Sequence, residues 1–83
     1  MTLGELLKNE RIKRGWSRRV ACMFYNEVNN TIFSISQMSD YESDRNLMSY
    51  VVLLNFGRLY GLDLNQLYKV SDPNAVDATE LSA

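Results

Sequence analysis

The chain has 83 residues, which is enough for one domain with a modest core and too few for two. Apolar residues make up 46% of it, and this composition argues against a disordered chain. There is no histidine and only one cysteine, Cys22, which excludes an internal disulfide, a cysteine metal cage and histidine-based catalysis. We therefore expect neither an enzyme nor a bound cofactor or metal.

The longest apolar run, residues 50–54, is far too short to cross a membrane. The N-terminus lacks the charged start and the apolar stretch of a signal peptide. The sequence therefore favours a cytoplasmic protein without membrane contact.

The net charge of −1 is unevenly distributed along the chain. Residues 1–19 carry six basic and two acidic side chains, whereas residues 20–83 carry three basic and eight acidic ones. Charges are screened within ~8 Å at physiological salt, so a local basic patch can attract a polyanion despite an acidic far side. The alternative is a solvated helix face.

The first two helices are predicted by capping residues and apolar spacing. Thr2 caps a helix that Gly15 ends, and Leu3, Leu6 and Leu7 share one face of it. A second helix, capped by Ser17, runs to about residue 25. Residues 26–31 are rich in turn formers and are predicted to be a loop.

Three further helices follow. Ser34 caps a helix to about residue 42 with Met38 and Tyr41 inward, and Ser49 caps a helix over residues 50–60 with Phe56 inward. Gly61 ends that helix, and Asp63 caps a last one over residues 64–70. The domain is thus expected to span residues 1–70, and residues 71–83 to form a mobile acidic tail or a linker.

Three segments carry a family resemblance through the order and spacing of their residues. They are Leu7-x3-Arg11-x3-Gly15-x-Ser17, then Phe33-Ser34-x3-Met38-Ser39-x-Tyr41-Glu42, then Ser49-x3-Leu53-x2-Phe56-Gly57-x2-Tyr60-Gly61-Leu62-x-Leu64-x2-Leu67. Across residues 3–68 this order resembles the Cro/repressor-like (XRE-type) helix-turn-helix family. The resemblance implies an all-α, compact five-helix lambda-repressor-like domain whose second and third helices read double-stranded DNA.

The resemblance also implies roles for individual residues. The third helix would present base contacts in the major groove, from Ser34, Ile35, Ser36, Gln37 and Asp40. Gln37 can pair with adenine and Ile35 can pack on a thymine methyl, while Asp40 repels phosphate unless it accepts from cytosine. Instead of a base contact, Ser34 could serve only as a helix cap, and Gln37 could be a solvated polar side chain.

Contacts to phosphate are expected from Arg18, Arg19, Arg45 and Asn46. Arg11 and Glu42 match positions that form a structural ion pair between the first and third helices. A homodimer on a two-fold operator is expected, with a possible dimer surface at Ile12, Leu64, Leu67 and Tyr68. Core packing is the alternative for all of these except Ile12.

The chain departs from the family pattern between the second and third helices, where it holds roughly six extra residues. Either an elongated loop at residues 26–32 lies beside the DNA-facing surface, where it contacts or blocks the groove, or the second helix is extended and then breaks. The inward pair of that helix is Val20–Ala21 or Ala21–Cys22. Asp44 stands in place of the usual glycine and Met48 in place of the usual proline.

These departures leave a competing hypothesis. The chain could be a protein-interaction module on the same fold, such as an antitoxin, an anti-repressor or a regulatory domain, that uses its acidic face or tail and binds little or no DNA.

Overall fold

The computed structural model describes residues 1–63 and 65–67, and the regular structure in this part of the chain is all helical. A short helical segment at residues 65–67 follows four longer helices, which are α1 (Leu3–Lys13), α2 (Arg18–Asn29), α3 (Ile35–Glu42) and α4 (Tyr50–Tyr60). The fold is therefore all-α, as predicted. The tail expected at residues 71–83 lies outside the described residues.

Each helix begins at a residue whose side chain satisfies a free backbone amide. The side chains of Thr2, Ser17 and Ser49 accept from the amides three residues further along the chain. Ser34 does the same for α3, and Asp63 for the segment at residues 65–67. The predicted helix starts are confirmed, because a cap needs only residues that are neighbours in the sequence.

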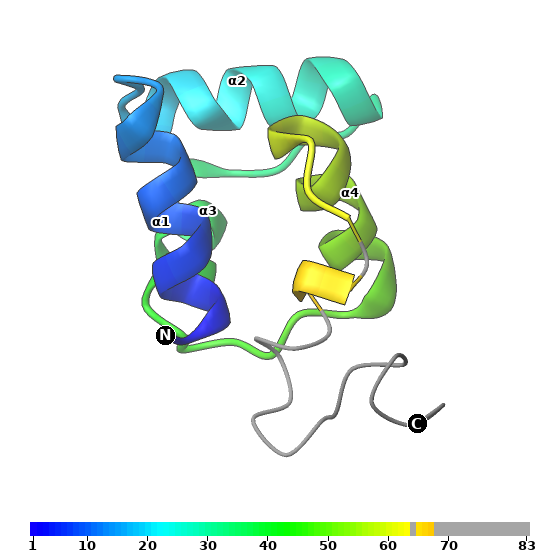
Figure 1. The fold of residues 1–83 in the computed structure, drawn as a ribbon. Coiled ribbons are helices and arrows are strands. Elements are labelled where there is room, and N and C mark those ends of the chain that lie inside the picture. The colour runs from blue at the N-terminus through cyan, green and yellow to red at the C-terminus, as the bar shows by residue number, and fades with distance from the viewer. Residues whose placement is uncertain (64, 68–83) are drawn as a thin grey trace, which may run out of the picture.

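The helices enclose one core (Figure 1). α2 runs along the top, α1 and α4 extend down from its two ends, and α3 lies behind α1; α2 packs on α3 and α4, and α1 packs on the same two helices. Every helix contributes to the buried cluster, which contains Leu7, Ala21, Cys22, Tyr25, Met38, Phe56 and Tyr60. The pair Ala21–Cys22, rather than Val20–Ala21, is buried on α2.

The second helix is longer than predicted. α2 continues to Asn29, and Asn30 ends it in the left-handed conformation, with φ 54°. Most of the extra residues are therefore helical, so the expected elongated loop at residues 26–32 is wrong, and the open alternative of an extended second helix describes the chain. The connection to α3 is short and consists of residues 30–34, including both caps.

Tertiary contacts explain why residues 26–29 are helical although their sequence favours a turn. The Asn29 side-chain nitrogen donates to the Asn55 backbone carbonyl oxygen in α4 at 3.2 Å, and the Asn29 side-chain oxygen accepts from Arg58 at 3.3 Å. The buried Asn55 side chain in turn donates to the Tyr25 hydroxyl at 3.1 Å. These bonds outweigh a helix propensity that differs from alanine's by only about 0.7 kcal/mol per residue.

The junction of α1, α2 and α4 is aromatic. The Trp16 ring packs on Phe24 with a centroid distance of 4.8 Å and on Tyr60 at 6.1 Å. The Arg14 guanidinium lies 5.1 Å from the Tyr60 ring centroid and donates to the Tyr60 carbonyl oxygen at 2.9 Å. Burial raises the pKa of the Tyr60 hydroxyl to about 12, so this side chain stays neutral.

None of the helices in the described part of the chain combines the length and the apolar character needed to cross a bilayer.

Candidate nucleic-acid interface

The N-terminal turn of α3 is the surface that sequence reasoning assigns to DNA bases. Ser34, Ser36 and Gln37 are exposed, and Ile35 retains 41% of its accessible surface. The opposite side of the helix is in the core, where Met38 is fully buried. The turn thus projects from the domain, and residues 26–29, being helical, do not form a loop that covers it.

A capping box occupies part of this turn. The Ser34 hydroxyl oxygen accepts from the Gln37 amide at 3.1 Å, and the Gln37 side-chain oxygen accepts from the Ser34 amide at 2.9 Å. Ser34 is therefore a helix cap, as its alternative role predicts. The Gln37 side chain is exposed, but its oxygen is hydrogen-bonded to the backbone. Pairing with adenine through both its oxygen and its nitrogen would require this box to open.

Asp40 lies further along α3 and is half-buried. Its carboxylate oxygen is 3.6 Å from an Arg45 guanidinium nitrogen, and the Arg45 side chain is 72% exposed. The negative charge of Asp40, which would repel phosphate, is thus partly compensated by Arg45, one of the residues predicted to contact phosphate. Asn46, beside Arg45, is exposed.

Glu42 ends α3 and joins two arginines. Arg11 donates to both Glu42 carboxylate oxygens, at 2.7 and 3.1 Å, and donates a third hydrogen bond to the Trp16 carbonyl oxygen. The side chains of Arg11 and Glu42 are only 9% and 1% exposed. The ion pair that the resemblance implies is present, and it fastens α1 to the C-terminal end of α3.

Arg18 is the second partner of Glu42. Its guanidinium donates to the same carboxylate at 3.1 Å, and its side chain is 42% exposed. In the folded chain Arg18, the predicted phosphate contact, is thus ion-paired with Glu42 and part-exposed, and its contact with phosphate stays a prediction. Its neighbour Arg19 is exposed and has no ion pair with any described residue.

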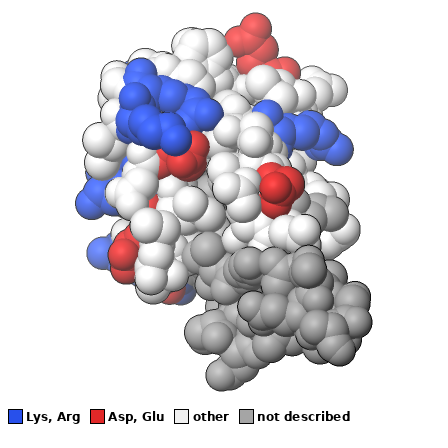
Figure 2. Space-filling model, in the orientation of Figure 1, with Lys and Arg blue, Asp and Glu red and all other residues white. Residues whose placement is uncertain are grey.

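Acidic side chains neutralise part of the positive charge of the basic N-terminal run in the folded chain. Glu10 pairs with Lys13 at 3.3 Å and with Arg14 at 3.0 Å. Figure 2 shows basic side chains gathered over the end of α1 with an acidic group directly beside them. Burial raises the pKa of Glu10, but hydrogen bonds from Arg14 and Lys13 outweigh it and lower the pKa overall, so this carboxylate stays ionised and neutralises part of the patch.

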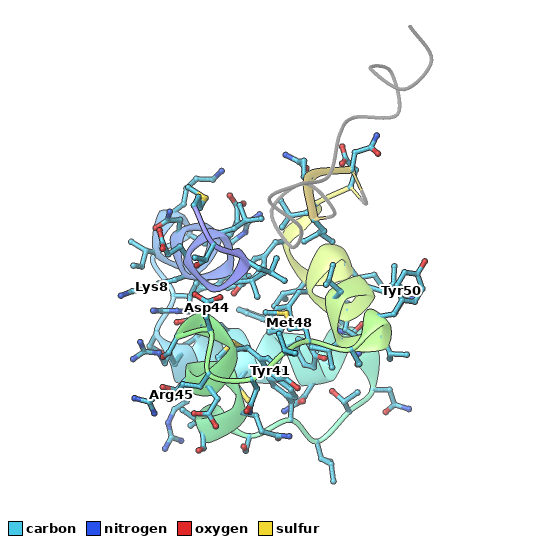
Figure 3. All side chains as sticks on the ribbon, turned by 90° about the horizontal axis from the view of Figure 1, so that it is seen from below. Lys8, Tyr41, Asp44, Arg45, Met48 and Tyr50 are labelled. Atoms are coloured by element: carbon cyan, nitrogen blue, oxygen red, sulfur yellow. The ribbon has the colours of Figure 1, made fainter. Side chains whose placement is uncertain are left out.

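Asp44 also caps a helix, a role that the sequence did not reveal. It has φ 60°, which confirms that it adopts the left-handed conformation of the glycine it replaces. Its carboxylate accepts from the Gly4 amide at 2.9 Å and from the Thr2 hydroxyl at 2.6 Å, and so it caps α1 from the segment that follows α3. Figure 3 shows Asp44 between the two helices, with Lys8 and Arg45 pointing outward on the same side.

Gly4 permits this close approach. A methyl group on its α-carbon would lie 2.5 Å from the Glu42 carbonyl oxygen and 2.6 Å from that of Tyr41. Only glycine lets the start of α1 touch the end of α3 in this way.

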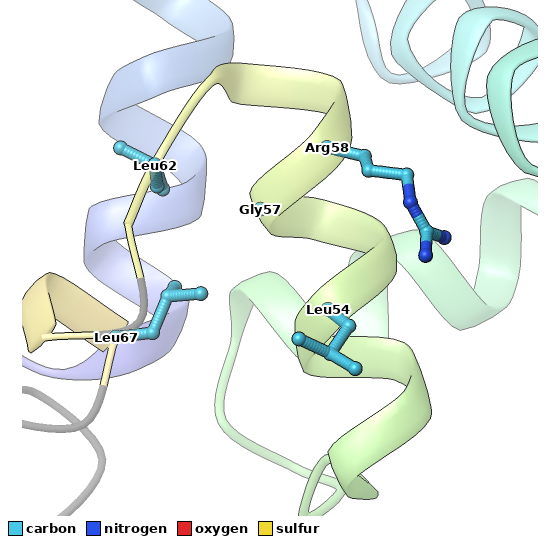
Figure 4. A pocket seen from close by; sticks show the side chains of 5 residues that line it. All are labelled: Leu54, Gly57, Arg58, Leu62 and Leu67. Carbon is cyan, nitrogen blue, oxygen red and sulfur yellow. The ribbon is translucent and has the colours of Figure 1, made fainter.

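Among the predicted dimer residues, Ile12 is 55% exposed and Leu67 only 1%. Leu67 contributes to one wall of a groove of about 220 Å³ that is also lined by Leu54, Gly57, Arg58 and Leu62 (Figure 4). The prediction of Leu67 as dimer surface is therefore wrong, since the side chain packs against α4. The side chains of Leu64 and Tyr68 lie outside the described residues.

The described residues bring no three His, Cys, Asp or Glu side chains together in a group that could hold a metal ion.

The described chain is thus an all-α domain with a projecting helix turn and a mixed-charge surround. No family model, no curated protein and no solved structure matches this sequence.

Proposed function

We propose that the chain is a sequence-specific, DNA-binding transcriptional regulator of the helix-turn-helix type, which acts in the cytoplasm and reads the major groove with the N-terminal turn of α3. The observation that carries the proposal is the exposure of residues 34–37 on a helix whose other end is held in the core. A recognition helix must be held rigidly by the rest of the domain, and its first turn must be accessible to DNA.

The chemistry of this turn suits base edges. The Ser36 hydroxyl can donate to or accept from several bases, and Ile35 offers an apolar contact for a thymine methyl. Since the capping box engages the Gln37 oxygen, the side-chain nitrogen is the atom available to a base, and it favours acceptors such as guanine O6 or thymine O4.

Phosphate attraction is expected to be modest. Four of the six basic residues in the N-terminal run, Arg11, Lys13, Arg14 and Arg18, are engaged by Glu10 or Glu42. Arg19, Arg45 and Asn46 are the remaining candidates for phosphate. Neutralisation of two phosphates by Arg19 and Arg45 corresponds to a slope of about −2 for each copy of the chain in a plot of log affinity against log salt.

One such turn reads too few base pairs to be selective in a genome. We therefore propose a homodimer on a two-fold operator with half-sites ~34 Å apart, with Ile12 as a candidate dimer contact.

Selection of bound duplexes from a random pool, with the full chain at low salt, tests this proposal. A palindromic consensus is expected. Ser36→Ala should then weaken binding to the consensus without affecting random duplexes, and Arg19→Ala should weaken both and reduce the salt slope by about 1 for each copy of the chain.

Arg58→Ala is the matched control for Arg19→Ala, since Arg58 is also exposed but lies on α4. Equal losses from the two arginine variants would contradict an interface at α2 and α3.

A second candidate function is a protein-interaction module on the same fold. It is favoured by Ile32 and Leu47, which are 97% and 98% exposed and lie in the segments before and after α3. A protein that docked on this side of the domain would bury both of these apolar side chains. Failure to enrich any duplex at low salt would support this candidate in place of the regulator.

A further inference from the structure

The residue that immediately precedes the cap of α3 is held by α2 on both of its backbone polar groups. The Asn26 side-chain oxygen accepts from the Phe33 amide at 2.6 Å, and the Asn26 side-chain nitrogen donates to the Phe33 carbonyl oxygen at 2.9 Å. One amide side chain thus pairs with one residue of the connection much as a neighbouring strand would.

Cys22 lies one turn earlier on the same face of α2 and reinforces this contact. Its thiol donates to the Phe33 carbonyl oxygen at 2.9 Å and accepts from the Asn26 side-chain nitrogen at 3.7 Å. Burial raises the pKa of the thiol, more than the hydrogen bond from Asn26 lowers it, so the sulfur keeps the proton that it donates. Asn26 and Cys22 together are called the Phe33 clamp below.

The remaining contacts of the connection are made with α2 and α3. Thr31 donates to the Asn26 side-chain oxygen at 2.8 Å and, from its amide, to the Asn26 carbonyl oxygen at 3.1 Å. The Phe33 ring stacks between Tyr25, at a centroid distance of 4.4 Å, and Tyr41, at 5.5 Å. The turn is therefore fixed by side chains, whereas a tight helix-turn-helix connection is fixed by a glycine-containing backbone turn.

The orientation of a short helix depends on what holds each of its ends. The ion pair of Glu42 holds the C-terminal end of α3 and Met38 is buried in its middle, while the Phe33 clamp holds the chain one residue before Ser34. We infer that Asn26, assisted by Cys22, is the positioning residue that fixes the angle at which α3 presents residues 34–37 to a duplex. This inference rests on the proposed function.

The experiment uses two asparagine variants at the same end of α2. Asn26→Ala removes the clamp, whereas Asn29→Ala removes a comparable set of hydrogen bonds that are directed to α4. In the protein without DNA, residual dipolar couplings of the α3 amides are expected to change relative to those of α1 and α4 in Asn26→Ala only. The Phe33 amide should also exchange with solvent about tenfold faster there.

With the selected duplex, Asn26→Ala is expected to lose about tenfold in affinity, the equivalent of one direct base contact, while its affinity for random duplexes stays unchanged. Asn29→Ala is expected to bind both as the wild type does. Unchanged α3 couplings in Asn26→Ala, or equal affinity losses in the two variants, would overturn the inference.

Cys22 provides a second pair if Asn26→Ala does not fold. Cys22→Ser keeps a donor for the Phe33 carbonyl oxygen and should retain the couplings, and Cys22→Ala should shift them. If the wild-type chain binds no duplex, the proposed function fails, but the couplings still decide whether the clamp positions α3.

Discussion

The two ends of α3 are built in opposite ways. At the C-terminal end, Glu42 is buried between two arginines and Asp44 caps α1. At the N-terminal end, the first turn is exposed and its hydrogen bonds run within the turn itself, from Ser34 to Gln37 and back. The polar residues of one end hold the fold, and those of the other leave most of their surface open for a ligand.

This difference predicts that substitutions along a single eight-residue helix separate into two classes. Changes near residue 42 should lower the free energy of unfolding. Changes near residue 36 should alter binding and leave the fold intact.

The largest effect is expected from Glu42→Gln. It leaves the buried Arg11 without its charge partner, and breaking a buried pair in this way typically costs about 3–5 kcal/mol. Urea unfolding of the variant and the wild type measures the loss. Arg18→Ala is the control, because its side chain is 42% exposed and should cost at most about 1 kcal/mol. Equal losses in the two variants would mean that Arg11 is not the main partner.

The next effect concerns the contact between α1 and the end of α3. Gly4→Ala should destabilise the protein by about 1–3 kcal/mol in spite of alanine's better helix propensity, because the added methyl group meets two backbone carbonyl oxygens. Gly57→Ala, whose methyl group would have its nearest contacts at 3.3 Å, should cost less. Thermal unfolding of both variants makes the comparison, and a stabilised Gly4→Ala would show that α1 and α3 are not so close.

Asp44→Ala should have a smaller effect, of about 1 kcal/mol, since it removes a helix cap for α1. Asp44→Gly distinguishes the contribution of the cap from that of the backbone conformation, because glycine accepts the positive φ but supplies no carboxylate. Chemical denaturation should find both variants less stable than the wild type. A fully stable Asp44→Gly would show that the left-handed backbone, and not the cap, is what matters at this position.

The smallest effect on stability is expected from Ser36→Ala, within about 0.5 kcal/mol, because this exposed side chain makes no hydrogen bond with any described residue. Equilibrium unfolding tests this directly. A loss above 1 kcal/mol would place Ser36 among the residues that hold the fold and would weaken the contrast between the two ends.

Local chemistry was predictable from the sequence. Thr2, Ser17, Ser34, Ser49 and Asp63 cap the helical segments because a cap needs no tertiary partner. The Arg11–Glu42 pair was available only through the family resemblance, since no local pattern links two residues so far apart in the chain.

The remaining features depend on tertiary contacts. The length of α2 follows from bonds between Asn29 and α4, and the sequence gives no sign of them beyond a run of asparagines that usually favours a turn. The second bond to Glu42, from Arg18, and the cap supplied by Asp44 also join segments that only the folded chain brings together. In the candidate site, the exposed positions of α3 could be predicted, but the electrostatic surroundings could not.

The aromatic junction at Trp16 has a practical consequence. The chain contains one tryptophan, so its emission has a single source, and that indole lies against Phe24 and Tyr60 between α1, α2 and α4. Fluorescence therefore reports the separation of these helices during denaturation without any added label. A spectral change on mixing with a duplex would reveal that docking reaches the start of α2 as well as the tip of α3.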